Sequence, residues 1–278
     1  RIFFGIGILN GMEIKDRTLD IMKGLAIVGI ILIHGLGSYD RETVPHIISQ
    51  LSELSVPVFF FISGYLFFIR HGDLDENNVG MYIVKRLKRL LVPYYLFLLF
   101  YIPLTYVINQ SVVSVWFFVE NLMISRNGIA WFVQLMVMFS LIMPCMLYLY
   151  KRSTTLYYIC AFASIIFSVI LLIYTPAINW RYYFFFPWSV ILFYSHVCAR
   201  RSIITVFSRF FFCFISILFI LIMIFTFMNG QSMSLSLHKF PPDIYYLLYG
   251  IIGIGVVHGV SRMIVAKSEA LSRVFEFT

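Results

Sequence analysis

The chain has 278 residues, of which 61% are hydrophobic and only 12% are charged, and its net charge is +8. A soluble protein of this length could not hide so much apolar surface, whereas a bilayer needs about 20 apolar residues per spanning helix. Composition therefore excludes an ordinary soluble domain and indicates an all-α, polytopic membrane protein. Cytoplasmic loops rich in Lys and Arg account for the positive charge, so no nucleic-acid partner is expected.

The chain begins with a short apolar segment, residues 2–9, that follows Arg1. This segment is too short to span a membrane and lacks a signal-peptide cleavage site. We leave residues 1–11 unassigned and expect residues 12–278 to form a single membrane domain.

Eight apolar runs have the length of a membrane-spanning helix. They cover residues 21–38, 54–70, 90–109, 129–150, 156–175, 181–199, 209–228 and 243–264. A further run, residues 112–124, is shorter and contains Glu120, which favours a re-entrant or interfacial segment. The sequence thus predicts a transmembrane bundle of about eight spanning helices.

Lys and Arg divide unevenly between the alternate loops of this map. One side holds most of them: Lys15, Arg17, Lys23, Arg70, Lys85, Arg86, Lys88, Arg89, Lys151, Arg152, Arg200, Arg201, Arg209, Arg262, Lys267 and Arg273. The other side holds only Arg41, Arg126, Arg181 and Lys239. Positively charged loops stay in the cytoplasm, so this asymmetry predicts a multi-pass protein whose N-terminal segment is cytoplasmic.

The first spanning run carries two basic side chains, Lys23 and His34, eleven positions apart. Eleven helical steps of about 100° bring both residues to within roughly 20° of one face, about 16 Å apart along the axis. Lys23 is expected at the cytoplasmic boundary and His34 in the outer half of the membrane. An ionisable residue at membrane depth points to a functional site, and a neutral imidazole can serve as a general base.

A second cationic group, Lys85, Arg86, Lys88 and Arg89, precedes Pro93 in the second cytoplasmic loop. Arg and Lys at this density suit the phosphates of a nucleotide-like ligand. The same cluster also fits a topology signal or an anchor on anionic lipid, and the sequence leaves these interpretations open.

Three further residues are candidates for supporting roles. Asp20 can pair with Lys23 on the helix surface, or it can be a solvated charge near a helix start. Ser63, beside Gly64, either contacts a ligand or belongs to a small pair that permits close helix packing. Glu120 lies in an apolar stretch and needs a partner or an aqueous cavity, which makes it a candidate for acceptor binding or for orienting the imidazole.

The cysteines and histidines give no sign of a metal site. The four cysteines lie in or beside apolar runs without paired spacing, and the histidines are scattered. The sequence therefore predicts neither a bound metal nor a disulfide framework, and the cysteines are expected to pack as small apolar residues.

Five motifs in order resemble the membrane-bound acyltransferase type 3 family, from about Ile14 onward. The first is Asp20, Lys23 and a following Gly, with His34 at the end of the same run. The others are Val56-Pro57-Val58-Phe59-Phe60-Phe61-Ile62-Ser63-Gly64-Tyr65, then Arg86 and Arg89 before Pro93-Tyr94, then Trp131-Phe132-Val133 with Phe139 and Pro144, and finally Lys239-Phe240-Pro241-Pro242-Asp243-Ile244-Tyr245-Tyr246.

This resemblance implies an O-acyltransferase that moves an acyl group, commonly acetyl, from cytoplasmic acyl-CoA to a hydroxyl of a cell-surface or lipid-linked carbohydrate. It implies His34 as the general base, and Lys23, Arg86, Arg89 and Ser63 as donor-binding residues. No bound cofactor is expected, since acyl-CoA is a substrate. The expected partners are acyl-CoA, a carbohydrate or glycolipid acceptor and membrane lipid, in a bacterial cytoplasmic membrane.

Three departures from the family pattern are visible. The basic residue of the first motif is often Arg, and Lys23 lacks its bidentate fork. The paired glutamates that some members carry after the Trp are missing from Gln134-Leu135-Met136-Val137-Met138. Members usually have a further terminal helix, so we expect the domain to be C-terminally incomplete.

Two other classes of function remain open on the sequence. In a transporter or flippase, His34 would line a substrate path and the substrate would move without thioester cleavage; such proteins often show paired helix breaks and repeats, and this chain shows no clear repeat. A degenerate family member with a scaffolding role is the third interpretation.

Overall fold

The computed structural model describes residues 2–36, 44–72, 76–109, 130–174, 176, 179–201 and 209–276. Within these ranges the chain folds into helices and irregular segments and forms no strand. The predicted all-α class is confirmed. The chain divides into two compact units, one formed by residues 1–70 with 160–278 and the other by residues 71–159.

The helices of the first unit are α1 (Ile2–Leu36), α2 (Val44–Ser52), α3 (Ser55–Arg70), α8 (Phe185–Arg200), α10 (Arg209–Met228) and α11 (Ile244–Glu276), with the short turns η1 (Trp180–Tyr182) and η2 (Leu235–His238). The second unit contains α4 (Glu76–Asn109) and α6 (Ala130–Arg152). Helix α7 (Thr154–Ile173) begins in the second unit and continues into the first.

Each of the eight predicted spans corresponds to a helix, and within the described ranges seven segments are long and apolar enough to cross a membrane. These are Arg17–Leu36, Ile47–Arg70, Asn78–Leu104, Trp131–Arg152, Thr154–Ile173, Phe210–Met228 and Ile244–Ser268. The chain is therefore a multi-pass membrane protein. The remaining helix, α8, has 16 residues, which makes it about 24 Å long and shorter than the hydrocarbon core.

Three details differ from the expected boundaries. Helix α8 begins at Phe185 instead of 181, because residues Trp180–Tyr182 form a 3-10 turn. Helix α1 extends back to Ile2 through the unassigned apolar segment, and the second span begins within the short helix α2, before its predicted start at 54. The possible re-entrant segment, 112–124, lies outside the described residues.

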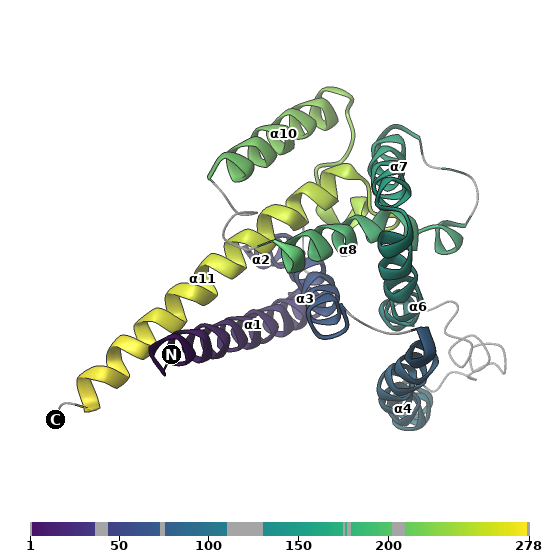
Figure 1. Ribbon diagram of the computed structural model, residues 1–278. Helices are drawn as coiled ribbons and strands as arrows, with labels where there is room; N and C mark the ends of the chain where they lie inside the picture. Colours follow the sequence, from purple (N-terminus) through teal and green to yellow (C-terminus); the bar gives the residue numbers. More distant parts are fainter. Residues whose placement is uncertain are drawn as a thin grey trace. The chain divides into compact units, whose positions relative to one another are not determined.

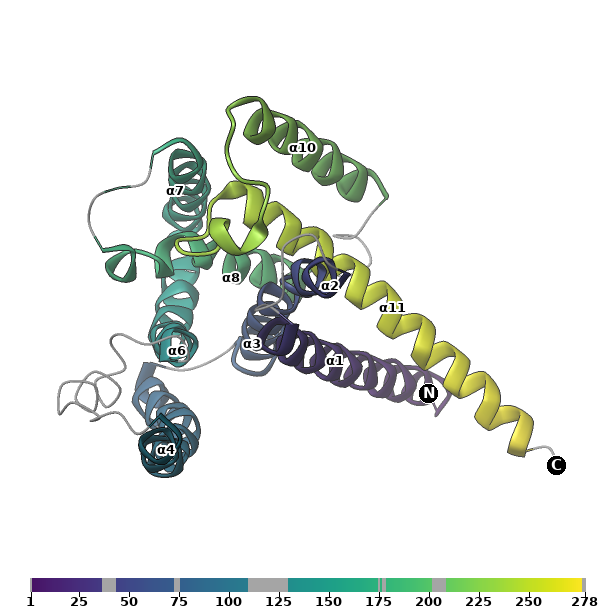
Figure 2. The same ribbon diagram turned by 180° about the vertical axis from the view of Figure 1, so that it is seen from behind.

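Helix α3 is at the centre of the first unit, with α1, α8 and α11 packed around it (Figures 1 and 2). Glycines allow this close approach. A methyl group at Gly29 of α1 would collide with Ser55, and one at Gly253 of α11 would lie 2.7 Å from the Leu54 side chain. Small residues at helix contacts are typical of membrane bundles, where apolar lipid gives the helices no hydrophobic reason to associate.

Aromatic side chains fill the space between α3, α8 and α11. Trp188 of α8 is fully buried, and its ring centroid lies 4.8 Å from that of Phe60 on α3 and 5.6 Å from that of Tyr246 on α11. Both contacts are edge-to-face, the geometry that aromatic quadrupoles favour. The core of the first unit therefore joins helices that are distant in sequence.

The second unit contains a helix pair, α4 and α6. Tyr94, Leu98 and Ile102 recur every four residues along one face of α4, and Val133 near the start of α6 packs against them. Arg86, further back on α4, contacts Ser140, further along α6, so the two helices run antiparallel.

Candidate functional site

His34 lies in the last turn of α1 and is exposed. Helix α1 is continuous between Lys23 and His34, so both side chains belong to one flank of a single helix, about 16 Å apart along its axis. The buried face of α1 is a neighbouring stripe that includes Met22, Ala26 and Gly29. The two basic residues therefore stay accessible while the helix packs against its neighbours.

The contact between α1 and α3 shows which end of the first unit His34 lies near. Gly29 meets Ser55, the first residue of α3, and His34 lies five residues further on, or roughly 7 Å along the axis. His34 is thus at the end of the first unit where α2 turns into α3.

Lys23 forms an ion pair with Asp20 one turn before it. The Lys23 ammonium donates to the Asp20 carboxylate at 2.7 Å, and the two side chains are 37% and 71% exposed. This geometry agrees with the interpretation that Asp20 orients Lys23. Because both groups are solvated, the pair leaves Lys23 able to exchange Asp20 for another anion at little cost.

Gly64 and Ser63, the small pair of α3, face different surroundings. Gly64 is buried, and a methyl group there would collide with the Ser195 hydroxyl and touch Leu192 of α8. Close helix packing therefore explains Gly64. Ser63 is half-buried, and its role as a donor-binding residue stays a prediction.

Arg86 and Arg89 are both on α4, in the second unit, and their surroundings differ. Arg89 is exposed with Lys85 and Lys88, whereas Arg86 is half-buried between α4 and α6. The Arg86 Nε group donates to the Ser140 hydroxyl at 3.0 Å. The cationic group thus consists of one arginine held by a helix contact and three solvated cations.

The predicted site residues fall into both units. His34, Lys23, Asp20 and Ser63 belong to the first, and Arg86 with Arg89 to the second. The described residues bring Asp20 to Lys23 and place Arg86 and Arg89 on neighbouring turns of one helix. Glu120 lies outside the described residues.

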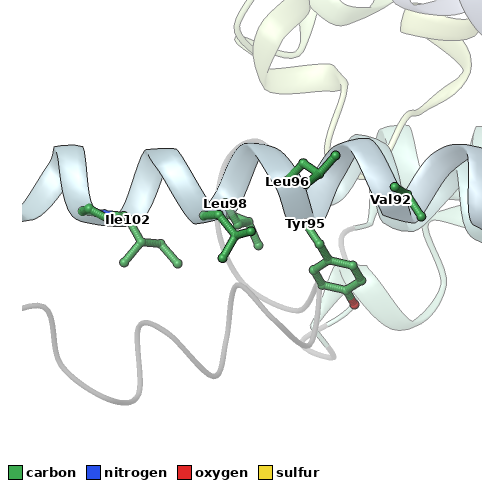
Figure 3. A pocket seen from close by; sticks show the side chains of 7 residues that line it. Val92, Tyr95, Leu96, Leu98 and Ile102 are labelled. Carbon is green, nitrogen blue, oxygen red and sulfur yellow. The ribbon is translucent and has the colours of Figure 1, made fainter.

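An apolar pocket of about 480 Å³ opens along α4, beyond the cationic group (Figure 3). Its lining comes from successive turns of the helix: Val92, Tyr95, Leu96, Leu98, Leu99, Ile102 and Pro103. These side chains supply hydrocarbon and a single phenolic hydroxyl. The pocket suits an alkyl chain and carries none of the acid or base groups that catalysis needs.

Sequence reasoning missed a buried ion pair in the first unit. Lys239, just after η2, donates to the Glu53 carboxylate at 2.9 Å, and the two side chains are only 7% and 4% exposed. The Tyr246 hydroxyl of α11 donates to the Glu53 backbone carbonyl at 3.0 Å. Through Glu53, the turn between α2 and α3 therefore contacts both Lys239, which precedes α11, and Tyr246 in its first turn.

Two further charged side chains, His238 and Asp243, flank Lys239 in the sequence. The His238 Nδ1 atom contacts the Asp243 carboxylate, and its Nε2 atom lies 2.6 Å from the Ser232 carbonyl oxygen. Both neighbours can accept a hydrogen bond, so the doubly protonated ring is the form that satisfies both contacts. Burial lowers the pKa of His238, but the hydrogen bond and charge of Asp243 and the Ser232 carbonyl raise that pKa further, leaving it above its ordinary value.

These interactions hold the segment that enters α11. Asp243 also accepts from the backbone N–H of Tyr246 at 3.1 Å, which is the bond an N-capping aspartate makes. This cap could have been predicted, because Pro-Pro-Asp directly precedes an apolar helix. No local sequence pattern predicted that Glu53 pairs with Lys239, because 186 positions separate the two residues.

Within the described parts of the chain, no group of three or more His, Cys, Asp and Glu side chains could hold a metal ion. The described cysteines, Cys145, Cys160, Cys198 and Cys213, are free thiols.

Residues 16–273 match a family model described as an acyltransferase domain, that of the acyltransferase type 3 family. The match begins before the first candidate residue, Asp20, and extends through both units into α11. Searches of curated proteins and of solved structures give no match.

Proposed function

Because the chain belongs to the acyltransferase type 3 family and is therefore a membrane acyltransferase, we propose that it transfers an acyl group, in the first place acetyl, from acyl-CoA to a carbohydrate hydroxyl. The acceptor is a cell-surface or lipid-linked glycan. One observation carries the proposal: the exposed imidazole of His34 lies in the last turn of α1, and Lys23 lies on the same uninterrupted helix.

His34 is the general base of the proposed reaction. Its neutral imidazole takes the proton from the acceptor hydroxyl while the hydroxyl oxygen attacks the thioester carbonyl. The new C–O bond forms, the C–S bond breaks, and the imidazolium returns its proton to the CoA thiolate. Imidazole suits both steps because the same ring can accept a proton and then release it.

Lys23, Arg86 and Arg89 are the proposed phosphate contacts for the donor. Lys23 is solvent-accessible, and its ion-pair partner among the described residues is an exposed carboxylate, so a phosphate can replace Asp20 beside it. The distance of about 16 Å between Lys23 and His34 is one that an extended pantetheine arm could follow along α1. Ser63 is proposed to contact the donor from α3, and Glu120 is proposed to support the acceptor or the imidazole.

The proposed setting is a bacterial cytoplasmic membrane, with the N-terminal segment in the cytoplasm. The distribution of Lys and Arg between alternate loops supports this orientation. It places the phosphate contacts at the inner face, where acyl-CoA is found, and His34 toward the outer face.

The test is CoA release from acetyl-CoA by the purified protein in lipid, with mixed membrane glycans as acceptors. Wild type is compared with His34→Gln, which keeps a polar side chain but cannot act as a base, and we expect release to fall by about 10²-fold or more. Ile31→Ala is the matched control, because Ile31 is an exposed residue one turn earlier on α1.

Equal release by wild type and His34→Gln would remove His34 from the chemistry. Movement of labelled glycan across vesicles without CoA release would favour the transporter interpretation instead.

A further inference from the structure

One flank of α4 changes from charged to apolar along its length. Lys85, Lys88 and Arg89 are exposed on the turns just before Val92, the first residue of the apolar pocket. Val92 follows Lys85 by seven positions and Lys88 by four, so at about 100° per residue all three lie within roughly 60° of one another. The exposed lysines and the pocket therefore share one flank of the helix.

The apolar part of this flank has the length of one membrane leaflet. Leu99 and Pro103 follow Lys85 by fourteen and eighteen positions, which returns both to within about 40° of its direction. From Val92 to Pro103 the pocket extends over eleven helical steps, or about 16 Å. The hydrocarbon core of a bilayer is about 30 Å thick, so this length matches one lipid chain in one leaflet.

The pocket has a floor that the helix pair fixes and a rim that is open. Leu98 and Ile102 are buried and belong to the apolar cluster between α4 and α6. Val92, Leu96 and Leu99 are exposed on the same stretch of helix. Figure 3 shows the labelled side chains following one another along α4. A long, narrow ligand can therefore lie in the hollow without displacing the packing beneath it.

A ligand that fits this flank has an anion at one end and an apolar chain directly next to it. Lys85 and Lys88 carry compact ammonium charges that suit a phosphate. About one turn separates Lys88 from Val92, so the phosphate and the chain must be adjacent. Anionic phospholipids have this arrangement, and basic residues beside a membrane-spanning segment attract them. Acyl-CoA does not have it, because the pantetheine arm separates its phosphates from its acyl chain.

We infer that α4 carries a binding site for an anionic phospholipid, with the phosphate at Lys85 and Lys88 and one acyl chain in the pocket. The inference goes beyond the proposed function, because neither lysine is a proposed donor contact and no step of acyl transfer is involved. In the proposed orientation the lipid belongs to the cytoplasmic leaflet.

The test measures phospholipid binding to the full chain in detergent by native mass spectrometry. Phosphatidylglycerol is compared with phosphatidylcholine of the same acyl chains, so the two ligands differ in headgroup and net charge. We expect phosphatidylglycerol to bind about 10-fold more tightly or better. Lys88→Gln should weaken its binding about 5-fold and leave phosphatidylcholine binding unchanged. Lys267→Gln, which removes an exposed lysine from α11, is the matched control and should change neither.

A second pair of variants tests the pocket. Leu99→Trp fills the hollow with a larger side chain and should weaken the binding of both phospholipids several-fold. Leu104→Trp adds the same bulk to α4 outside the pocket lining and should leave binding unchanged. Leu99 and Leu104 are both exposed, so both variants should fold, and equal thermal midpoints in detergent check this.

The outcomes identify the occupant of this flank. If Lys88→Gln weakens phosphatidylglycerol binding but Leu99→Trp does not, the lysines attract an anionic surface and the pocket site is overturned. If only Leu99→Trp weakens binding, the pocket takes any lipid chain, and the anionic ligand is overturned. If Lys88→Gln weakens acetyl-CoA binding and leaves phosphatidylglycerol binding unchanged, the lysine serves the donor and the lipid site is overturned. If Leu99→Trp instead dissociates a dimer, the flank is an interface between two copies of the chain, which also overturns the lipid site.

Discussion

The two units each hold a cation between their helices, but against different partners. In the first, Lys239 is enclosed with Glu53, and the pair ties the α2–α3 turn to the segment that enters α11. In the second, Arg86 is held between α4 and α6 by the neutral hydroxyl of Ser140. A charge buried with its counter-charge serves the fold, whereas the Ser140 hydroxyl links Arg86 to a second helix without being a charged group itself.

The largest expected effect is the loss of one partner of the buried ion pair. Lys239→Met leaves the Glu53 carboxylate buried without its counter-charge, and we expect the free energy of unfolding to fall by about 3–5 kcal/mol. Trp188 packs against Tyr246 in this unit, so thermal unfolding followed by tryptophan fluorescence measures the loss. Lys267→Met is the matched control on the exposed surface of α11.

Two further variants sharpen this comparison between units. The double variant Glu53→Gln with Lys239→Met removes both charges, and it should recover a large part of the lost stability. Arg86→Met should destabilise much less than Lys239→Met, since the Ser140 hydroxyl still donates to the Met136 carbonyl. Equal losses for Arg86→Met and Lys239→Met would mean that the fold depends on Arg86 as much as on the buried ion pair.

A smaller effect is expected where glycines allow the helices of the first unit to meet. A methyl group at Gly253 would lie 2.7 Å from the Leu54 side chain, and one at Gly250 would lie 2.7 Å from Pro57. Either change to Ala should destabilise by about 1–3 kcal/mol through overpacking.

Gly259→Ala is the matched control on the same helix, because a methyl group there meets nothing within 4 Å. Alanine is the better helix former, so this control should be neutral or more stable by up to about 1 kcal/mol. If all three variants had the same thermal midpoint, the close approach of α11 to α3 would be wrong.

The sequence predicted the helices far better than the contacts between them. Runs of about 20 apolar residues identify spans by length alone, and the run 209–228 matches α10 at both ends. Helix α8 was harder to delimit, because the aromatic residues before it continue the apolar run through a 3-10 turn. Composition cannot separate such a turn from a helix.

Only part of the candidate site could be predicted from the sequence, because some of its contacts join different helices. Periodicity on one helix was enough to place Lys23 and His34 on one flank of α1, with Asp20 one turn before Lys23. The contact of Ser140 with Arg86 crosses 54 positions, and nothing local marks a serine in an apolar helix as an arginine partner. Pairings between helices depend on packing, which a single sequence does not encode locally.

The pH dependence of stability should reveal the next smaller effect, at His238. The pKa of His238 is raised in the folded state, so its contribution is fully present below the ordinary pKa of histidine, about 6.5, and is lost as pH rises through the higher folded value. The groups around the ring are Asp243, the Ser232 carbonyl and the Tyr245 ring. Lys239, the partner of Glu53, follows His238 directly in the chain. Deprotonation removes one donor from this cluster.

We therefore expect the thermal midpoint of the wild type to fall as the pH rises above about 6.5, and to fall less in His238→Gln. Protease cleavage within residues 229–243 should become faster over the same range. An identical pH profile for both proteins would mean that His238 is not an imidazolium in the folded state.

The smallest effect on stability is expected at the exposed ion pair on α1. This pair tests whether burial decides how much an ion pair of the first unit stabilises the fold. Lys23 belongs to the first unit with Lys239, but its partner Asp20 is 71% exposed. Asp20→Asn should therefore change the free energy of unfolding by less than about 1 kcal/mol. If Asp20 only orients Lys23, the same variant should shift Kd for acetyl-CoA by a few fold, and Lys23→Arg should keep donor binding. A stability loss comparable with that of Lys239→Met would mean that the first unit depends on its exposed ion pair as much as on its buried one. A small loss would mean that Lys23 can exchange Asp20 for another anion at little cost to the fold.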